Sequence, residues 1–333
     1  MKLDYSFIIP VYNRPQETME LLESFTKVLF SESYEIVIVE DGSSETSEAI
    51  VNSFRDKLNI SYYFKSNSGP GASRNYGMER STGNYFIILD SDCLLPPHYL
   101  RTVDDYLSLD FHHCYGGADA AHTSFTPLQK AINYVMTSFL TTGGIRGNVK
   151  SVSNFEPRSF NMGISKEAFK KTKGFAKIHP GEDPDLSQRI LKAGFTTTFI
   201  PNAFVYHKRR ISWKKFYTQV KKFGMVRPIL NKWHPKASKI TFWFPTLFVL
   251  FTIVSLLGSI FYNWILILPL LFYVGLVFLD STFKNRSVYI GLLTIIALFV
   301  QFFGYGIAFI RSTFFIGILN KDPEKQFPML FFK

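Results

Sequence analysis

The sequence predicts an α/β domain with a mostly parallel sheet, followed by helices long and apolar enough to span a membrane. Two observations lead to this prediction. Short β-type runs alternate with helical patterns over the first part of the 333-residue chain, and a stretch without any charged residue follows at 241–279. One membrane-spanning helix needs about 20 residues, so this stretch is long enough for two.

The alternation is clearest before residue 90. Apolar, β-rich runs predict strands at 6–12, 34–40, 60–64 and 85–90, and helical spacing predicts helices at 15–29, at 44–57 and from near Ala72. A further strand pattern covers 197–207. The region 116–160 is rich in Gly, Thr and Ser with one helical pattern at 127–140, and is predicted to be a long active-site insertion. In such sheets ligands bind beyond the carboxyl ends of the strands.

The net charge of +11 is concentrated in one block. No acidic residue occurs from Leu186 to Leu279, whereas Lys and Arg crowd 208–239, immediately before the apolar stretch. This distribution argues against nucleic acid as a partner. By the positive-inside rule it places residues 1–240 in the cytoplasm, on a multi-pass protein of the inner (cytoplasmic) membrane. Cys93 and Cys114 suggest no disulfide framework, and the amino terminus shows no signal peptide.

The apolar part divides into three candidate spans at 241–260, 263–279 and 287–310, with a short tail at 311–333. Three complete spans would leave a basic tail outside the cell, against the usual bias. We expect this arrangement because the first charged boundary dominates orientation; the alternative is a third segment that re-enters or lies along the inner face. The preceding segment 208–240 predicts a basic amphipathic helix on the anionic membrane surface, with Phe216, Val220 and Phe223 at helical spacing.

Polar residues follow three of the predicted strands, in "PVYNR" (10–14), "VEDGSS" (39–44) and "ILDSDC" (88–93). Asp90 and Asp92 place two like charges in one small space, and a divalent cation would resolve their repulsion. The alternative for this pair is capping of the helix that "PPHYL" opens. Asp41 could likewise serve only a turn and a helix cap.

The glycines of "SGPGASRNYG" (68–77) suggest a phosphate-binding loop. They do not fit the dinucleotide fingerprint, because they lie far from the first strand. Gly69 and Gly71 still permit close backbone approach, and the amides at the start of the following helix can meet an anion. Arg74 lies one helical turn further on.

Together these pieces resemble the family 2 glycosyltransferases of the bacterial membrane-anchored type, which have the nucleotide-sugar-binding GT-A fold. The motifs "IIPVYN", "VEDGSS", "NSGPGASRNYG", "ILDSDC", "FNMGISKEAF" and "GEDPDLSQRILKAG" occur in the family's order over about 5–230. The resemblance implies a catalytic domain at 1–207. It implies that Asp41 binds the donor base, that Asp92 with Asp90 holds the metal and diphosphate, and that Asp183 is the catalytic base. The remaining donor-binding residues that it implies are Pro10, Tyr12, Gly71, Arg74, Gln219 and Arg227. The spacing of Gln219 and Arg227 departs from that of processive synthases, which leaves processivity open.

The chemistry asks for these residue types independently. The acceptor hydroxyl must lose a proton as it attacks, and a carboxylate within hydrogen-bond reach can take it. Asp183 is the expected base, with Glu182 and Asp185 as rivals; capping of the following helix explains Asp185 better than Asp183. His207 could complete the metal shell, or be an ordinary surface histidine. One base without a separate nucleophile implies single displacement with inversion at the anomeric carbon.

We therefore expect a membrane-anchored, inverting glycosyltransferase that uses a UDP-sugar or another nucleotide-sugar with Mn²⁺ or Mg²⁺. The membrane anchor suggests a lipid-linked glycan acceptor, such as one on polyprenyl diphosphate. A dehydrogenase would need a glycine fingerprint after the first strand, which "PVYNRPQ" lacks. A membrane scaffold or lipid-linked-sugar translocation protein with a degenerate catalytic domain remains the alternative. The sugar, the acceptor, the linkage and the oligomeric state stay open.

Overall fold

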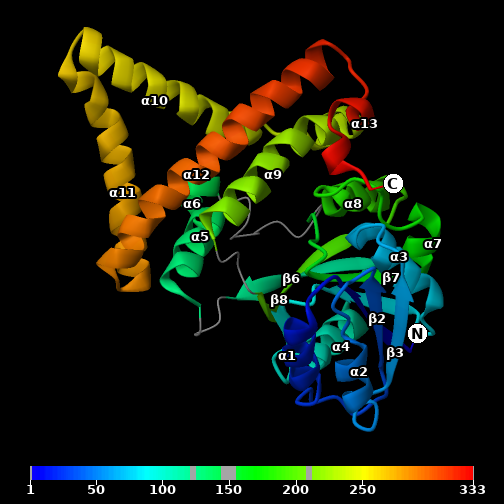
Figure 1. The fold of residues 1–333 in the computed structure, drawn as a ribbon. Helices are drawn as coiled ribbons and strands as arrows, with labels where there is room; N and C mark the ends of the chain where they lie inside the picture. Colours follow the sequence, from blue (N-terminus) through cyan, green and yellow to red (C-terminus); the bar gives the residue numbers. More distant parts are fainter. Residues whose placement is uncertain (1, 121–124, 144–154, 208–211, 333) are drawn as a thin grey trace. The chain divides into compact units, whose positions relative to one another are not determined.

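The computed structural model describes residues 2–120, 125–143, 155–207 and 212–332 (Figure 1). The chain forms two compact units. The first contains residues 1–122, 150–208 and 331–333, and the second contains 123–149 and 209–330. The tail residues Phe331 and Phe332 thus belong to the first unit, although the chain that leads to them belongs to the second.

The first unit is built on an eight-stranded sheet with strand order β3-β2-β1-β4-β7-β6-β8-β5. The strands are β1 Tyr5–Val11, β2 Glu35–Asp41, β3 Ile60–Lys65, β4 Tyr85–Leu89, β5 Cys93–Leu94, β6 Cys114–Ala120, β7 Asn161–Ser165 and β8 Thr197–His207. β3, β2, β1 and β4 are mutually parallel, and β6 and β8 are also parallel, whereas β7 is antiparallel to both of its neighbours. The expected α/β architecture is confirmed, with a more mixed second half.

Helices cover both faces of this sheet. They are α1 Pro15–Phe25, α2 Glu48–Phe54, α3 Pro70–Arg80, α4 Tyr99–Leu109, α7 Lys166–Thr172 and α8 Glu182–Lys192. One face packs on α1, α2 and α4 through residues such as Phe7 and Ile38; the other packs on α3, α7 and α8 through residues such as Ile8 and Val37. Burial on both faces explains why the central strands read as continuous apolar runs rather than alternating ones.

The parallel strands set the position of the site. Because β1, β2 and β4 run in the same direction, Tyr12, Asp41 and Asp90 all lie at their carboxyl ends, at one edge of the sheet. Gly77 lets α3 approach the sheet closely, since a Cβ there would lie 2.8 Å from the side chain of Ile8. The start of α3, with Arg74 in its second turn, is thereby held against the same strands.

The second unit is helical. Its helices are α5 Pro127–Thr137, α6 Phe139–Thr142, α9 Trp213–Trp233, α10 Phe244–Phe261, α11 Leu268–Asn285, α12 Val288–Ser312 and α13 Pro323–Gln326. Short 3₁₀ turns at Pro235–Ala237, Ile240–Trp243, Trp264–Ile267 and Pro328–Leu330, and a π-helical stretch at Thr313–Ile318, complete it. Thr126 caps α5 by accepting the N–H of Gln129 and so begins the helix predicted at 127–140.

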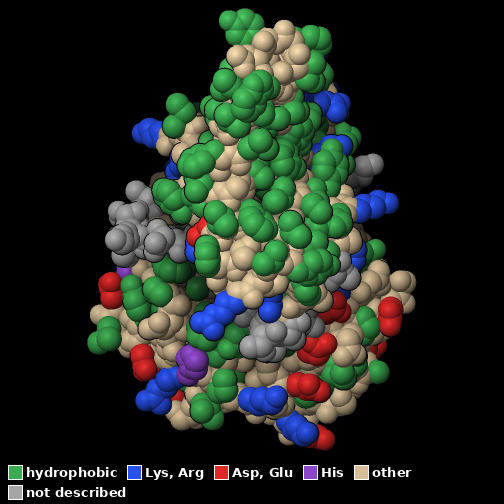
Figure 2. Space-filling model, turned by 90° about the vertical axis from the view of Figure 1, so that its left-hand side faces the viewer, with side chains coloured by type: hydrophobic (Ala, Val, Ile, Leu, Met, Phe, Trp, Pro, Cys, Tyr) green, Lys and Arg blue, Asp and Glu red, His purple; other side chains and the backbone are tan. Residues whose placement is uncertain are grey.

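Three segments of the second unit are long and apolar enough to cross a membrane: Ile240–Phe261, Trp264–Asn285 and Val288–Ile318. The three apolar segments expected from the sequence are therefore present as helices. Large apolar side chains are exposed along α10 and α11. Figure 2 views the protein from the side on which these two helices lie in Figure 1, and shows an extended apolar area.

The apolar side of α9 is covered by protein. Phe216 and Val220, which the sequence places on a membrane-facing stripe, are buried in a cluster with Phe302 of α12. The face that the sequence assigns to the membrane surface is thus covered by protein, and α12 supplies much of that cover. Residues 208–211 of the segment expected at the membrane surface lie outside the described residues.

Candidate active site

Asp41 ends β2 and is almost fully buried. Its carboxylate accepts the backbone N–H groups of Ser68 and Gly69, each at 2.9 Å, and it is paired with the ammonium group of Lys65. The turn between β3 and α3 is therefore organised around this carboxylate, and Gly69 takes a positive φ of 89° there. Its expected contact with a donor base stays a prediction.

The two glycines of this loop have packing reasons of their own. A Cβ on Gly71 would lie 3.0 Å from the carbonyl oxygen of Ala176, and one on Gly69 would overlap the ring of Phe332. Gly69 also donates its backbone N–H to Asp41. Both glycines are thus needed for contacts within the protein, and the expected donor-binding role of Gly71 remains a prediction.

Arg74 joins two of the acidic motifs. Its guanidinium is buried and lies 2.8 Å from Asp90 and 3.2 Å from Glu182, 108 residues further along the chain. The ring of Phe175 lies 5.2 Å from it. A buried arginine between two carboxylates compensates charges that would otherwise repel, so Arg74 holds "ILDSDC" and "GEDPDL" at one place.

Asp90 and Asp92 follow β4, as the sequence predicts. Arg14, just before α1, lies 2.6 Å from Asp92, and Arg74 of α3 is paired with Asp90. Each acid thus has its own arginine partner. The backbone of His207 pairs with Cys93, directly after Asp92, which brings β8 alongside the motif. Among the described residues no cluster of three acidic, His or Cys side chains could hold a metal ion. The side chain of His207 lies outside what the structure describes.

The donor set nevertheless fits a hard divalent cation. Carboxylate oxygens are the ligands that Mg²⁺ and Mn²⁺ prefer, and one or two of them suffice where phosphate oxygens of a substrate complete the shell. Asp90 and Asp92 supply these oxygens from either side of Ser91, directly after β4. Asp90 and Asp92 would hold such an ion together with a diphosphate. The ion would then replace part of their ion pairing with Arg14 and Arg74.

The three acids at the start of α8 have different surroundings. Glu182 is buried and accepts from Arg74 and from His179, whose Nδ1 lies 2.7 Å away. Asp185 is paired with Arg189 at 2.7 Å. Among the described residues, none donates a hydrogen bond to the buried Oδ1 atom of Asp183. This oxygen of Asp183 is therefore the one that a substrate hydroxyl could reach without displacing a protein partner.

The pKa values of Glu182 and Asp183 are shifted in opposite directions. Burial alone would raise the pKa of Glu182, but His179 and Arg74 outweigh it and lower that pKa to about 2. Burial and the neighbouring charge of Glu182 raise the pKa of Asp183 above its ordinary value, against the opposing effects of Arg74 and Arg158. Adjacent acids whose environments separate their pKa values often have different roles in one site.

The remaining expected donor residues are placed as follows. Pro10 lies in β1 beside Val39, and Tyr12 is half exposed just beyond the end of that strand. Gln219 and Arg227 lie on α9 in the second unit, where the Arg227 guanidinium lies 4.2 Å from the centre of the Phe242 ring.

Four polar residues that organise the site were missed from the sequence: Asn13, Arg14, Lys65 and His179. The Asn13 side chain accepts the backbone N–H groups of Ser44 and Glu45 and so fixes the loop after β2. His179 precedes Glu182 by three residues, a spacing that could have indicated their contact. Arg14 lies within the motif "PVYNR" itself, although its partner is 78 residues away.

A mixed sheet with a parallel half, and with acidic residues gathered at the carboxyl ends of its strands, defines an α/β protein whose ligand site is expected at that edge of the sheet. The family model described as glycosyl transferase family 2 matches residues 6–172, half of the chain. The chain belongs to this family, and the resemblance seen in its motifs is confirmed.

Curated relatives cover parts of the chain. It is 32% identical over 144 residues to an uncharacterized glycosyltransferase of Rickettsia bellii, covering 43% of this chain and 20% of that one. The poly(ribitol-phosphate) β-N-acetylglucosaminyltransferase TarS of Staphylococcus aureus is 32% identical over 114 residues, 33% of this chain and 20% of TarS. Chondroitin synthase of Escherichia coli is 26% identical over 235 residues, 61% of this chain and 34% of the synthase. The chain thus spans a fifth to a third of the length of these relatives.

Solved structures share the fold. The mannosyltransferase PcManGT from Pyrobaculum calidifontis, in complex with GDP-Man and Mn²⁺, superposes with a TM-score of 0.60 at 13% identity, covering 97% of this chain and 89% of that one. A fragment of S. aureus TarS (1–349) with UDP-GlcNAc gives 0.50 at 16% identity, covering 94% and 92%. The GT-A fold expected from the sequence is thereby confirmed.

Proposed function

We propose that this protein is a membrane-anchored, inverting glycosyltransferase that transfers a sugar from a nucleotide-sugar to a lipid-linked glycan acceptor in polysaccharide synthesis. The single observation that carries the proposal is the pairing of Arg74 with both Asp90 and Glu182. It brings the acidic pair after β4, which suits a diphosphate bound to a divalent cation, next to Asp183, which suits the role of proton acceptor. A nucleotide-sugar transferase needs both in one site.

In this proposal Asp183 is the general base. The Oδ1 atom of Asp183 accepts the proton of the acceptor hydroxyl while the hydroxyl oxygen attacks the anomeric carbon, and the nucleoside diphosphate leaves from the opposite face. Glu182 and Asp185 are less suited, because Glu182 is paired with Arg74 and His179, and Asp185 with Arg189. One displacement by the acceptor inverts the configuration.

Asp90 and Asp92 would hold a divalent cation with the donor diphosphate, and the cation would neutralise the charge that grows on the leaving group. Arg14 and Arg74 neutralise the same acids before the donor binds. Asp41 would bind the base of the nucleotide close to the turn that it organises. Pro10, Tyr12 and Gly71, from motifs at the same edge of the sheet, would also contact the donor. Gln219 and Arg227 would contact the diphosphate from α9.

The relatives support a nucleotide-sugar donor. One structural neighbour holds UDP-GlcNAc and another holds GDP-Man with Mn²⁺. Two curated relatives are named as enzymes of polymer synthesis, TarS and chondroitin synthase. The apolar helices support an acceptor presented at the bilayer, and the basic segment before them supports a cytoplasmic catalytic unit on the inner membrane.

The test is a screen of UDP- and GDP-sugars with membranes that contain the protein, in the presence of Mn²⁺ or Mg²⁺, followed by mass spectrometry of the lipid fraction. We expect one nucleotide-sugar to be consumed and one lipid-linked product to gain its sugar. Binding of nucleotide without consumption of any donor, by protein that retains its fold, would favour the scaffold or translocation alternative instead.

A further inference from the structure

We propose that α12 lies along the membrane surface on the side of the catalytic unit, so that the chain crosses the bilayer only in the α10–α11 hairpin and its carboxyl terminus stays on the catalytic side. This differs from the three-span arrangement expected from hydropathy. The inference rests on the membrane anchoring in the proposed function, and not on the transfer reaction.

The helix α12 bridges the two open ends of the hairpin. Near its start, Thr294 shares a hydrogen bond of 2.7 Å with Ser281 at the end of α11. Near its end, the carbonyl of Gly306 accepts from the hydroxyl of Thr246 at the start of α10, at 3.0 Å. If α10 and α11 cross the bilayer one after the other, these two ends lie at the same membrane surface. A helix that touches both, at points about 18 Å apart along its axis, follows that surface (Figure 1).

The helix α12 also contacts α5. The segment 123–149, which contains α5, leaves the catalytic unit and returns to it, so it stays on that side. The middle of α12 meets it, because the Gln301 side chain donates to the carbonyl of Val135 at 3.0 Å. A crossing α12 would have its middle in the hydrocarbon core, where α5 could not follow.

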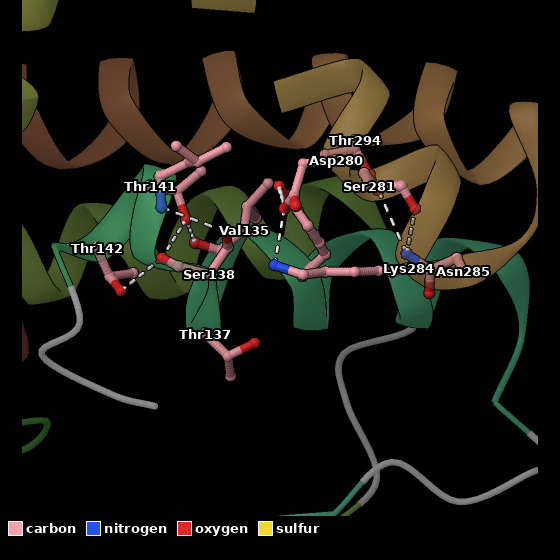
Figure 3. A network of polar contacts seen from close by, with 12 residues as sticks. Val135, Thr137, Ser138, Thr141, Thr142, Asp280, Ser281, Lys284, Asn285 and Thr294 are labelled. Atoms are coloured by element: carbon pink, nitrogen blue, oxygen red, sulfur yellow. Dashed lines mark hydrogen bonds and ion pairs between the residues drawn. The ribbon is translucent and has the colours of Figure 1, made fainter. Parts of the chain in front are cut away.

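Polar contacts at the base of α11 agree with this placement (Figure 3). The hydroxyl of Tyr134 on α5 donates to Asp280, and Lys284 lies 2.8 Å from the same carboxylate. A charged pair of this kind is expensive inside hydrocarbon and ordinary at the polar surface. The end of α11 therefore lies at the surface that α5 occupies.

The second half of α12 runs beside α9. Gly304 lies against Val220, and the backbone of Tyr305 lies against Gly224. The hydroxyl of Ser312 donates to the carbonyl of Met225 at 2.6 Å. The exposed side chains of α9 include the four lysines Lys214, Lys215, Lys221 and Lys232. Carrying α9 into the bilayer beside a crossing helix would bury several of these charges, which is costly.

The tail of the chain is bound to the catalytic unit. Phe331 forms a β-bridge with Ile178, and the N–H of Phe332 donates to the carbonyl of Lys177 at 3.1 Å. These contacts lie within the catalytic unit, beside His179. Only 319–330 separate them from the end of the apolar helix, and part of that segment is folded into α13. It would have to cross the bilayer again to return from the far side, and it is too short and too polar to do so.

The remaining exposed side of α12 identifies its partner as the lipid. Five apolar side chains that are about half exposed recur at helical spacing along α12 and the π-helical stretch that follows it: Leu292, Ile296, Ile307, Ile310 and Phe314. A helix with protein on one side and an apolar stripe on the other, flanked by exposed lysines, is suited to the boundary between head groups and acyl chains.

The first test compares the sides of the membrane on which two engineered cysteines lie. Glu324→Cys reports the tail and Asp56→Cys reports the catalytic unit; both native positions are exposed, and the native Cys93 and Cys114 are buried. A membrane-impermeant maleimide is added to right-side-out and to inside-out vesicles. We expect both cysteines to react in the same vesicle orientation. Reaction of the two in opposite orientations would overturn the proposal.

The second test measures depth with nitroxide labels and their collisions with oxygen and with a water-soluble nickel complex. Leu250→Cys near the middle of α10 and Ile240→Cys at its edge supply a deep and a shallow reference. Ile307→Cys lies near the middle of the third apolar segment. We expect it to match the shallow reference; a depth equal to that of Leu250→Cys would show that α12 crosses. Neither measurement depends on sugar transfer, so failure of the proposed activity would not affect the result.

Discussion

The guanidinium of Arg14 lies 2.6 Å from the carboxylate of Asp92, while that of Arg74 lies 2.8 Å from Asp90. The two acids expected to hold a divalent cation are thus each neutralised by an arginine. A cation that enters this site must compete with both arginines for the same oxygens. The guanidinium of Arg14 is more exposed than that of Arg74. The ion pair between Arg14 and Asp92 is therefore the easier one for a cation to replace.

Replacing Arg14 should therefore strengthen cation binding in the absence of donor. For Arg14→Gln we expect the affinity for Mn²⁺ to rise by about 3- to 10-fold, because a partly exposed ion pair contributes about 1 kcal/mol. Isothermal titration of purified protein measures it. Arg101→Gln removes an exposed arginine paired with Asp105 and should leave the affinity unchanged. An unchanged or weaker affinity in Arg14→Gln would show that the ion does not bind at Asp92.

Transfer should depend on the cation. If Asp90 and Asp92 share it with the donor diphosphate, excess EDTA should abolish transfer, and Mn²⁺ or Mg²⁺ should restore it. Asp92→Asn should weaken donor binding in the presence of the cation much more than in its absence, which titration with a nucleoside diphosphate can measure. Full activity in excess EDTA would refute this role.

The positions of the acids could be predicted because they depend on local sequence and one general rule. Apolar runs identify β1, β2 and β4, and parallel strands place their carboxyl ends at one edge. The partners of these acids could not be predicted, because Arg14–Asp92 and Arg74–Glu182 join residues 78 and 108 positions apart. Such pairings arise only when the fold is complete.

Two further features show what the sequence pattern omits. The region predicted as an insertion begins within β6 and ends just before β7; these strands contain Gly116, Gly117 and Gly163, which carry no β signal. Gly163 is required because the ring of Tyr115 packs directly over it. On α9, the 3.6-residue periodicity shows that one face is buried. It does not show whether lipid or another helix covers that face.

Removing the proposed base should spare the donor site. We expect Asp183→Asn to bind nucleotide about as tightly as the native protein while turnover drops by at least ~10². Titration with a nucleoside diphosphate and single-turnover transfer measure the two quantities. Asp185→Asn, whose native carboxylate is paired with Arg189, is the matched comparison and should retain turnover to within a few-fold. Near-normal turnover in Asp183→Asn would move the role to Glu182 or Asp185.

The pH dependence of transfer should report the same group. A base acts only when deprotonated, and burial beside Glu182 raises the pKa of Asp183. The rate should therefore fall as the pH drops through a value above the ordinary aspartate pKa of about 3.9. A profile of kcat/KM from pH 4 to 8 measures this limb. Its midpoint should rise further when a neighbouring positive charge is removed, as in Arg158→Gln, because Arg158 lowers the pKa of Asp183. A midpoint that stays fixed in Arg158→Gln would assign the limb to another group.

Glu182 should contribute to stability in a pH-dependent way. Its carboxylate is buried between Arg74 and His179, and its folded-state pKa is lowered to about 2 from an ordinary value of 4.5. Because the folded state holds the proton less tightly than the unfolded state, the stabilisation is present above about pH 4.5 and is lost as the pH falls toward 2.

Glu182→Gln removes this contribution and leaves Arg74 with Asp90 as its remaining acidic partner, so we expect a loss of about 3 kcal/mol near pH 7. Thermal unfolding in detergent at a series of pH values measures the difference from the native protein, with the exposed Glu79→Gln as the control. The gap between Glu182→Gln and the native protein should narrow as the pH falls below 4.5. A gap of constant size down to pH 3 would mean that the carboxylate of Glu182 is not ionised in the folded protein.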